Sequence, residues 1–502
     1  MDDLTLLSVE EMGEADQITI RGGTPGIELM ETAGATVSDA IAARFTPRRT
    51  LVVCGPGNNG GDGFVVARLL REQGWDVALT LLGECDDLRG DAALAAAKWD
   101  GQVAALTPDL LDGVELLVDS LFGAGLARDI DGVAFDFLER ARTMVNDGAL
   151  TSVAVDMPSG VDGNTGAVRG GAVPAVMTVT FFRKKPGHML YPGHALSGEI
   201  VVTDIGIRAD VLREIDPATF ENARELWAFA LPRPDVASHK YTRGHAVISG
   251  GAMTGAGRLA ARAARRTGAG LLTVAAPSDL CPLFSADAPG VIMAPVDDVA
   301  AFSDLLSDTR KNAVLVGPGH GVSEHTRSIA EEALSGERAV VLDADAISVF
   351  ASEVEALSSL IRAPVVLTPH QGEFARLFPN LSGSKLEVAR AAAELVGAVI
   401  VLKGSDTVIA APDGRAAING NAPPWLATGG TGDVLAGTVL GLLSQGMPAF
   451  EAAAAAVWIN GAAASRFGPG LIAEDLPELF PRIFADDLGW SDISSNSSSR
   501  ER

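Results

Sequence analysis

The sequence is poor in cysteine and in long apolar runs. Its 502 residues include three cysteines, Cys54, Cys85 and Cys281, none of which forms a CxxC pair. A disulfide framework or a zinc site is therefore not expected, and we predict buried structural thiols. No uninterrupted apolar segment reaches the roughly 18 residues of a membrane span. The acidic N-terminal stretch MDDLTLLSVEEMGEAD is unlike a signal peptide, so we predict a cytoplasmic protein.

Basic residues are also scarce. Lysine and arginine total 39 against 64 aspartates and glutamates, which gives a net charge of −25. Nucleic acids and anionic membranes both bind positive surfaces, so neither is expected as a partner. Hydrophobic residues make up 47% of the chain and charged residues 21%, which is typical of a soluble α/β protein with large cores. A chain of this length is expected to form two or three domains.

Strand-like apolar runs alternate with helical patterns along the whole chain. Examples are LVVCG, VALTLLG and LLVDSLFG in the first half, and HAVISGG, AVVLDAD and AVIVLKG in the second. This alternation predicts mostly parallel sheets with helices on both faces, which is an α/β fold. The pattern decays near residues 212–228, where we predict a linker between domains at 1–212 and 225–488. The serine-rich tail, 491–502, is predicted to be disordered.

Three polar, turn-forming segments follow strand-like runs in the first half. In a doubly wound sheet such segments converge on the ligand crevice, so Asn59, Asp119 and Ser159 would offer oxygen ligands to a hard cation. One carboxylate among neutral oxygens favours potassium over a transition metal. Each segment taken alone could instead be a simple capped turn. The segments are Gly57–Gly63 (GNNGGDG), Asp119–Gly125 (DSLFGAG) and Asp156–Asp162 (DMPSGVD).

The glycine-rich segment GNNGGDG carries a carboxylate, Asp62, where a bound phosphate would be repelled. It does not match GxGxxG, so a Rossmann dehydrogenase is disfavoured. We interpret its glycines as allowing close approach of a cofactor, and we expect Asp62 to accept hydrogen bonds from substrate or from loop amides.

The second half contains TGGTGD, Thr428–Asp433, directly before a helical pattern at 434–443. The chain has no GxxxxGK[ST] motif and is therefore not a P-loop enzyme. Backbone N–H groups of Gly430–Gly432 at a helix N-terminus would form an anion hole for a transferred phosphate. Asp433 is then placed to take a proton from an attacking hydroxyl. The alternative is that Asp433 is an ordinary acidic residue favoured by the helix dipole.

Four motifs of the first half, GPGNNGGDG, DSLFGAGL, DMPSGVDGNTG and GEIVVTDIGI, together resemble the N-terminal domain of the NAD(P)HX epimerases, the YjeF-type proteins. The resemblance covers roughly residues 5–210. It implies a Rossmann-like αβα domain that epimerises damaged, hydrated nicotinamide cofactors, with potassium at Asn59, Asp119 and Ser159 and a catalytic Asp156. The substrate-binding residues that it implies are Asn58, Asn59, Gly60, Gly61, Asp62, Gly123, Ala124, Gly125, Leu126, Ala127, Arg128, Asp129 and Asp156.

TGGTGDVLAG resembles the anion-hole motif of ribokinase-like enzymes. With GPGHG, TPHQGEFARL and LKGSDTVIA, it is similar to the ADP-dependent NAD(P)HX dehydratase domain over roughly residues 225–488. The resemblance implies a ribokinase-like αβα domain in which Asp433 is the catalytic base and magnesium accompanies ADP. It places Ala256, Gly319, His370 and Asp433 at the hydrated cofactor. It places Lys403, Gly404, Ser405, Asp406, Thr407 and Gly432 at the adenine nucleotide. Taken alone, His370 could be a turn histidine.

Together the resemblances imply a bifunctional repair enzyme. It would epimerise R- and S-NAD(P)HX and dehydrate the S form to NAD(P)H at the expense of ADP, giving AMP and phosphate. Its partners would be NADHX, NADPHX and ADP, and we expect a homo-oligomer. Two alternatives stay open, a ribokinase-superfamily kinase for a small molecule and a non-catalytic nucleotide-binding scaffold.

Overall fold

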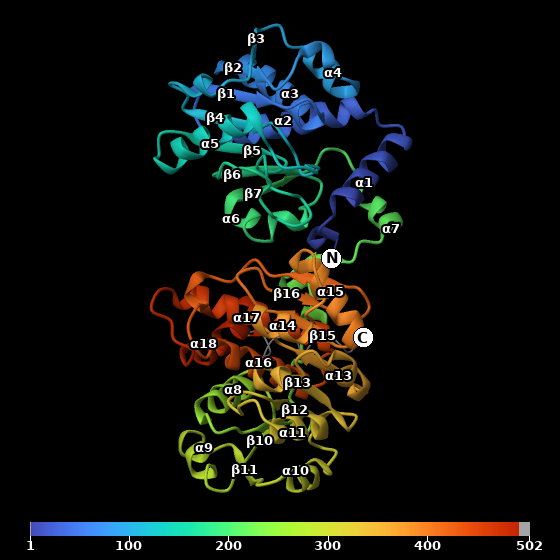
Figure 1. The fold of residues 1–502 in the computed structure, drawn as a ribbon, viewed down its shortest axis with the longest axis vertical. Helices are drawn as coiled ribbons and strands as arrows, with labels where there is room; N and C mark the ends of the chain where they lie inside the picture. Colours follow the sequence, from blue (N-terminus) through green and yellow to red (C-terminus); the bar gives the residue numbers. More distant parts are fainter. Residues whose placement is uncertain (1, 491–502) are drawn as a thin grey trace. The chain divides into compact units, whose positions relative to one another are not determined.

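The computed structural model describes residues 2–490, apart from the side chains of Asp2 and Asp287. The tail predicted to be disordered, 491–502, lies outside these residues. The chain divides into two compact units, residues 2–219 and residues 220 onward, and each is described by itself (Figure 1). Across the described positions, no helix is long and apolar enough to cross a membrane.

The N-terminal unit is built on a seven-stranded parallel sheet with the order β3-β2-β1-β4-β5-β6-β7. The chain adds strands outward from β1 on one side and then returns to add β4 on the other. A reversal of this kind opens a ligand crevice at the carboxyl ends of the two central strands. The strands are β1 Arg49–Cys54, β2 Asp76–Leu81, β3 Val103–Ala105, β4 Leu116–Ser120, β5 Thr151–Val155, β6 Met177–Phe181 and β7 Glu199–Thr203.

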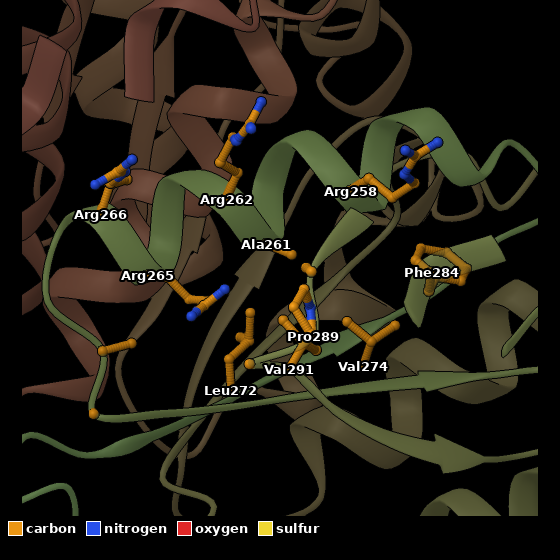
Figure 2. A pocket seen from close by; sticks show the side chains of 14 residues that line it. Arg258, Ala261, Arg262, Arg265, Arg266, Leu272, Val274, Phe284, Pro289 and Val291 are labelled. Carbon is orange, nitrogen blue, oxygen red and sulfur yellow. The ribbon is translucent and has the colours of Figure 1, made fainter. Parts of the chain in front are cut away.

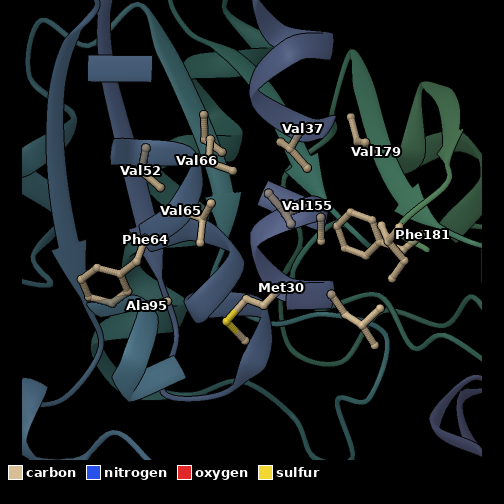
Figure 3. Packing of buried hydrophobic residues seen from close by; sticks show 14 of the residues in the cluster. Met30, Val37, Val52, Phe64, Val65, Val66, Ala95, Val155, Val179 and Phe181 are labelled. Atoms are coloured by element: carbon tan, nitrogen blue, oxygen red, sulfur yellow. The ribbon is translucent and has the colours of Figure 1, made fainter. Parts of the chain in front are cut away.

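Helices cover both faces of this sheet. Val52 and Cys54 of β1 pack with α2 and α3, whereas Leu51 and Val53 pack with Phe137 of α5. Figure 3 shows the first of these two layers. Alternate residues of one strand are thus buried on opposite faces, as expected for a parallel sheet inside an αβα sandwich. The helices are α1 Val9–Arg21, α2 Gly26–Arg44, α3 Asn58–Glu72, α4 Gly90–Ala96, α5 Gly132–Asn146, α6 Gly193–Ser197 and α7 Leu212–Ile215.

The second unit contains a ten-stranded sheet with the order β11-β10-β9-β12-β13-β14-β15-β16-β17-β8. Strands from β11 to β15 in this order are parallel, and β16 pairs antiparallel with both β15 and β17. The strands are β8 Thr219–Glu221, β9 His245–Ser249, β10 Leu271–Ala276, β11 Ile292–Pro295, β12 Ala313–Val316, β13 Ala339–Leu342, β14 Val365–Leu367, β15 Val399–Leu402, β16 Val408–Ala410 and β17 Ala416–Ile418.

The segment predicted as a linker, 212–228, is not irregular chain. It contains α7 and β8, and the division between the two units falls within β8. Elements of three or four residues are too short to show a hydrophobic period, which is why the sequence pattern appeared to decay there.

One helix of the second unit, α16, is buried on nearly all sides. Glycines let it lie against α8, since a Cβ on Gly437 would be 2.2 Å from Ala260 O and one on Gly441 would be 2.1 Å from Thr267 Oγ1. This close packing fixes the helix whose first turn carries Asp433. The helices of the unit are α8 Thr254–Arg266, α9 Cys281–Asp287, α10 Val299–Leu306, α11 Glu324–Leu334, α12 Asp345–Ser348, α13 Val354–Leu360, α14 Gln371–Leu377, α15 Lys385–Val396, α16 Thr431–Ser444, α17 Ala449–Phe467 and α18 Asp475–Arg482.

The predicted α/β class with two αβα units is confirmed by these sheets. The expectation of buried thiols is correct for Cys54 but wrong for Cys85, which is exposed, and Cys281 is only half-buried. Cys85 begins a short 3-10 turn that follows β2, outside the layers that bury the strands.

Candidate active sites

Asp156 is held in a strained position at the carboxyl end of β5. Its φ of +63° lies in the left-handed region, which non-glycine residues adopt rarely and often at functional sites. Its Oδ1 accepts hydrogen bonds from Lys185 Nζ at 2.7 Å and Thr180 Oγ1 at 2.9 Å. Its Oδ2 accepts one from the backbone N–H of Ala124 at 3.1 Å. The carboxylate is therefore fixed from both sides, with 15% of the side chain exposed.

The charge on Asp156 is set by Lys185, whose side chain is only 2% exposed. Burial alone would raise the pKa of Asp156, but the ammonium outweighs it and lowers the pKa to about 2. Burial, followed by the same ammonium, lowers the pKa of His188 to about 4, so its imidazole is neutral at pH 7. Lys185 N–H donates to His188 Nδ1 at 2.9 Å, so Nε2 carries the proton and donates to Asp156 O at 2.8 Å.

The sequence analysis did not identify Lys185, Thr180 or His188. The available signal was the stretch FFRKKPGHM after the β6 strand, in which a lysine and a histidine follow an apolar strand end closely. The stretch does not show that the two side chains turn inward.

The glycine-rich segment is mostly helix and not loop, which corrects the sequence interpretation. Helix α3 begins at Asn58, so Gly60, Gly61 and Asp62 lie in its first two turns. A Cβ on Gly60 would lie 1.9 Å from Gly55 O, so the helix starts directly against the end of β1. The glycines thus serve helix–strand packing, and their role in close approach of a cofactor stays a prediction.

Asp62 is a buried carboxyl with no protein hydrogen-bond donor among residues 2–490. Burial, with the carboxylates of Asp156 and Asp16, raises its pKa well above the ordinary value. Asp16, on α1, has its pKa raised to about 6, mainly by burial. Among the described residues no loop amide bonds Asp62, and its contact with substrate stays a prediction.

The predicted potassium ligands lie near the carboxyl ends of three strands: Asn59 is in the first turn of α3 after β1, Asp119 is the penultimate residue of β4, and Ser159 follows β5. Ser159 donates to Asp119 twice, from Oγ to Oδ1 at 2.5 Å and from N–H to Oδ2 at 2.9 Å. When the Asn59 amide is oriented so that both of its ends find partners, its nitrogen donates to Val155 O at 3.1 Å and its oxygen accepts from Gly123 N at 3.2 Å. In the described part of the chain, no hydrogen bond joins Asn59 to Asp119 or Ser159.

The chemistry of this donor set fits a monovalent hard cation. Asp119 is fully buried, and burial raises its pKa although the Ser159 hydrogen bonds oppose the shift. Within residues 2–490, no group of three His, Cys, Asp or Glu side chains could hold a metal ion. One buried carboxylate with hydroxyl and amide oxygens suits potassium better than a transition metal.

The predicted substrate loop, Gly123–Asp129, divides between two places. Its first residues lie at Asp156, because a Cβ on Gly123 would be 3.1 Å from Asp156 Oδ2 and 3.2 Å from Asn59 Cγ. Its far end, Leu126, Arg128 and Asp129, lines a cavity of about 480 Å³. Gly125 and Ala127, between them, are exposed, as is Asn58 at the start of α3.

The second unit places Asp433 in the first turn of α16. The helix begins at Thr431, three residues earlier than predicted, after Gly430 turns the chain with a φ of +92°. Lys403 from the end of β15 reaches this turn, since a Cβ on Gly432 would lie 3.5 Å from Lys403 Nζ. Burial and then the Asp343 carboxylate raise the pKa of Asp433 to about 6, although Lys403 opposes the shift.

Asp343 is a functional candidate that the sequence analysis missed. It follows β13 and is 2% exposed, and its Oδ1 accepts from Lys403 Nζ at 2.9 Å and from Thr368 Oγ1 at 2.8 Å. Burial disfavours the charge on Lys403, but Asp343, Glu373 and Asp433 together raise its pKa. The Lys403 ammonium thus lies beside Gly432, in the segment predicted to form the anion hole. The signal was the DADAI motif, where a carboxylate ends a strand.

The predicted nucleotide loop after β15 is held by a hydrogen bond within the loop and by an ion pair to α15. Thr407 Oγ1 donates to Gly404 O at 2.8 Å, Ser405 is exposed, and Asp406 pairs with Lys385 of α15. The loop begins at Lys403, so its first residue lies beside Gly432 in the first turn of α16. Contact of its residues with ADP stays a prediction.

The four residues predicted at the hydrated cofactor, Ala256, Gly319, His370 and Asp433, lie on four segments. Met253 N–H donates to Gly319 O at 3.0 Å, which joins the Gly319 turn to the start of α8, where Ala256 lies in the first turn. His370 is the N-cap of α14, its Nδ1 accepts from Gly372 N at 2.9 Å, and its side chain is 57% exposed. His370 therefore caps a helix start, as the alternative of a turn histidine predicts, and its contact with the cofactor stays a prediction.

Two family descriptions match the chain. Residues 26–187 match "YjeF-related protein N-terminus", and residues 246–478 match "NAD(P)H-hydrate dehydratase". The bifunctional NAD(P)H-hydrate repair enzyme Nnr of Salinibacter ruber is 36% identical over 96% of this chain and 97% of that protein. The Nnr of Moorella thermoacetica is 35% identical over 95% and 96%. The chain belongs to the bifunctional NAD(P)H-hydrate repair enzyme family.

A solved structure is similar to about half of the chain. The ADP/ATP-dependent NAD(P)H-hydrate dehydratase of Bacillus subtilis, co-crystallised with ATP/Mg²⁺, is 32% identical, with a TM-score of 0.48, and the match covers 53% of this chain and 97% of that chain. Membership of the repair enzyme family confirms the predicted family and enzyme class. The roles of individual residues, potassium, the homo-oligomer and the cytoplasmic location stay predictions.

A second cavity of this repair enzyme, of about 510 Å³, lies beside α8 (Figure 2). Arg258, Arg262, Arg265 and Arg266 line it, and none of the predicted site residues does. Glu478 pairs with Arg262 at 3.2 Å and with Arg266 at 2.5 Å. Size alone therefore does not identify the active site of this unit.

Proposed function

We propose that this enzyme repairs hydrated nicotinamide nucleotides in two steps. The N-terminal unit interconverts R- and S-NAD(P)HX, and the second unit dehydrates the S form at the expense of ADP, giving NAD(P)H, AMP and phosphate. Family membership over nearly the whole chain supports both steps. The observation that carries the proposal is the position of Asp433, in the first turn of α16 with Lys403 beside Gly432. A carboxylate able to take a proton thus borders backbone N–H groups able to bind a phosphoryl group.

The dehydratase chemistry follows from that arrangement. Hydroxide leaves carbon poorly, whereas phosphate leaves well, so the substrate hydroxyl must first be phosphorylated. Asp433 takes the hydroxyl proton while the hydroxyl oxygen attacks the β-phosphorus of ADP and AMP departs. The C–O bond then breaks with its electrons going to phosphate, the ring nitrogen lone pair forms the new π bond, and loss of a proton from the neighbouring carbon restores NAD(P)H.

Lys403 holds positive charge where the transferred phosphoryl group passes, and Asp343 fixes it there through the 2.9 Å contact. Magnesium is held mainly by phosphate oxygens with one or two carboxylates, and Asp343 and Asp433, which both act on the charge of Lys403, are available for that purpose. When bound, it would neutralise charge on the nucleotide phosphates.

In the epimerase unit, Asp156 is assigned as the catalytic carboxylate. It is ionised, fixed by three donors and placed beside the Gly123 loop, so it can hold or accept the proton of the hydroxyl on the hydrated carbon. Asn59, Asp119 and Ser159 would hold potassium, which would offset part of the negative charge of the neighbouring carboxylates.

The test is the conversion of S-NADHX by the full-length enzyme with ADP, followed by the absorbance of the reduced nicotinamide. Asp433→Asn is expected to lower the rate by a factor of about 10² or more. Glu324→Gln is the matched control, because Glu324 is an exposed acid in the first turn of another helix, α11. Absence of NADH from the wild-type reaction contradicts dehydration, and a stable phosphorylated product without NADH identifies a kinase. Full activity of Asp433→Asn contradicts the assignment of the base.

A further inference from the structure

The cavity at the far end of the substrate loop lies over the carboxyl ends of three adjacent strands. Pro56 follows β1, Glu84 follows β2, and Phe122 follows β4, and all three line the cavity. β1 pairs with both β2 and β4, so these ends form one continuous edge. The volume of about 480 Å³ is in the range of a ligand pocket.

In doubly wound sheets that bind dinucleotides, the residue at the position of Glu84 contacts the adenosine ribose. A nucleotide bound over the first strand places its adenosine ribose at the end of the neighbouring strand. An acidic residue there accepts hydrogen bonds from the ribose hydroxyls, whereas an arginine there accommodates a 2′-phosphate. Glu84 is exposed and lies three residues after β2 ends at Leu81, and it is 21 residues beyond Gly63, the last glycine in the first turns of α3. This chain therefore has an acidic residue, and not an arginine, at the position that contacts the ribose.

Most of the charged residues that line the cavity are acidic. Glu84, Asp87, Asp129 and Asp131 line it, and Arg128 is the only cation among its lining residues. A phosphate monoester brings a charge of about −1.5 to −2 at pH 7. Bringing like charges together costs affinity steeply, and the net charge of −25 on the chain adds repulsion of the same sign.

We propose that the epimerase site prefers NADHX to NADPHX, because Glu84 binds the adenosine ribose hydroxyls and the acidic rim repels a 2′-phosphate. The proposal rests on the proposed epimerase function. It adds a specificity that the family description, which covers both nucleotides, does not contain.

The experiment uses the full-length chain carrying Asp433→Asn, so that the dehydratase does not consume the epimers. R-NADHX and R-NADPHX are supplied separately, and the S form is quantified by liquid chromatography. We expect kcat/KM for NADHX to exceed that for NADPHX by about tenfold or more. Glu84→Arg is expected to lower the NADHX value and raise the NADPHX value, so that the ratio falls by at least about tenfold.

The matched control is Asp76→Arg. Asp76 is the exposed first residue of the same strand, β2, at the edge opposite the cavity, so it makes the same charge change away from the ligand. Its ratio is expected to equal that of the parent protein. Arg128→Ala is expected to change both hydrates by a similar factor.

The outcomes separate the two proposals. If neither hydrate is epimerised, the proposed epimerase function fails. If both are epimerised but NADPHX is used equally well or better, the specificity proposal alone is overturned. It is also overturned if Arg128→Ala selectively abolishes NADPHX turnover, or if Glu84→Arg leaves the ratio at the parental value.

Discussion

Lys185 Nζ and Asp156 Oδ1 lie 2.7 Å apart in a buried ion pair, 29 residues apart in the sequence. Burying two charges costs solvation free energy, and the cost is offset only where further hydrogen bonds satisfy both groups. Here Thr180 Oγ1 contacts both, at 2.9 Å from the carboxylate oxygen and 3.0 Å from the ammonium. The pair therefore fixes both the position and the ionisation of the proposed catalytic carboxylate.

Replacing Lys185 by methionine is expected to destabilise the N-terminal unit by about 3–5 kcal/mol, because it leaves a buried carboxylate uncompensated. Denaturant unfolding of the full-length protein measures the change. Adding Asp156→Asn should recover part of the loss. Lys98→Met is the control, since Lys98 pairs with Glu31 but is 50% exposed, and an exposed pair contributes about 0–1 kcal/mol. Equal losses in the two single variants would contradict the argument.

The acid dependence of this stability follows from the depressed pKa of Asp156. Its folded-state pKa of about 2 lies below the unfolded value of about 3.9, so the stabilisation is complete above pH 4 and is lost as the pH falls toward 2. The Lys185→Met protein is expected to lose this part of the acid dependence.

The pH profile of dehydration reports on Asp433. Its pKa of about 6 predicts that kcat/KM falls about tenfold per unit below pH 6, because the base must be ionised. This fall on the acid side is the acid limb of the profile. Asp343→Asn removes a like charge, so it should move the acid limb to lower pH. Lys403→Met removes the opposing charge, so it should move the acid limb to higher pH.

These opposite shifts distinguish electrostatic coupling from general damage to the site. A structural defect lowers kcat/KM at every pH without displacing the limb. Glu324→Gln, on α11, should leave the limb where it is in the wild type. If the acid limb lies at the wild-type pH in both Asp343→Asn and Lys403→Met, the electrostatic coupling of these two residues to Asp433 is contradicted.

Local sequence patterns predicted the central parallel strands of both sheets and the strand ends at Asp119 and Asp156, whereas Asp433 was predicted at a helix start and lies in the first turn of α16. A residue that follows a buried parallel strand must lie at the carboxyl edge of the sheet, so its place is determined by the strand. Helix starts were less certain. Glycine lowers helix propensity, so GNNGGDG indicated a loop, yet packing against the end of β1 makes it the first turns of α3.

Lys185 and Asp343 were missed because their roles depend on partners that are distant in sequence. Lys185 reaches Asp156, and Asp343 is met by Lys403, 60 residues farther along the chain. Nothing in KKPGH or DADAI shows which side chain turns inward. The hydrophobic period describes burial of apolar faces, whereas these pairs are buried charges whose positions follow only from the assembled fold.

Potassium is expected to activate the epimerase and not the dehydratase. Replacing potassium by tetramethylammonium should lower epimerisation while ADP-dependent repair of S-NADHX persists in the same sample. Asp119→Asn keeps the shape of a buried side chain but removes the carboxylate, and should weaken potassium binding by at least about tenfold. A second readout is thermal unfolding of the N-terminal unit, which bound potassium should stabilise in the wild type and not in Asp119→Asn. Identical epimerase rates with and without potassium contradict the site.

Gly123→Ala tests how closely the predicted substrate loop, Gly123–Asp129, meets the proposed catalytic carboxylate of Asp156. Its φ lies outside the left-handed region, so alanine is tolerated by the backbone, but the added Cβ would lie 3.1 Å from Asp156 Oδ2 and 3.2 Å from Asn59 Cγ. One of these groups must move by a few tenths of an ångström, and the 3.1 Å bond from Ala124 N to Asp156 is the contact most directly strained.

Because proton transfer depends on such distances, epimerisation by Gly123→Ala is expected to fall about 10- to 100-fold. The unfolding midpoint should change little, and dehydration of S-NADHX should be unchanged. Gly13→Ala is the matched control, because it adds a methyl group to α1 in the same unit, where nothing lies within 4 Å. It should keep full epimerase activity and be slightly more stable, since alanine favours a helix. A Gly123→Ala protein as active as Gly13→Ala would show that the loop does not set the position of Asp156.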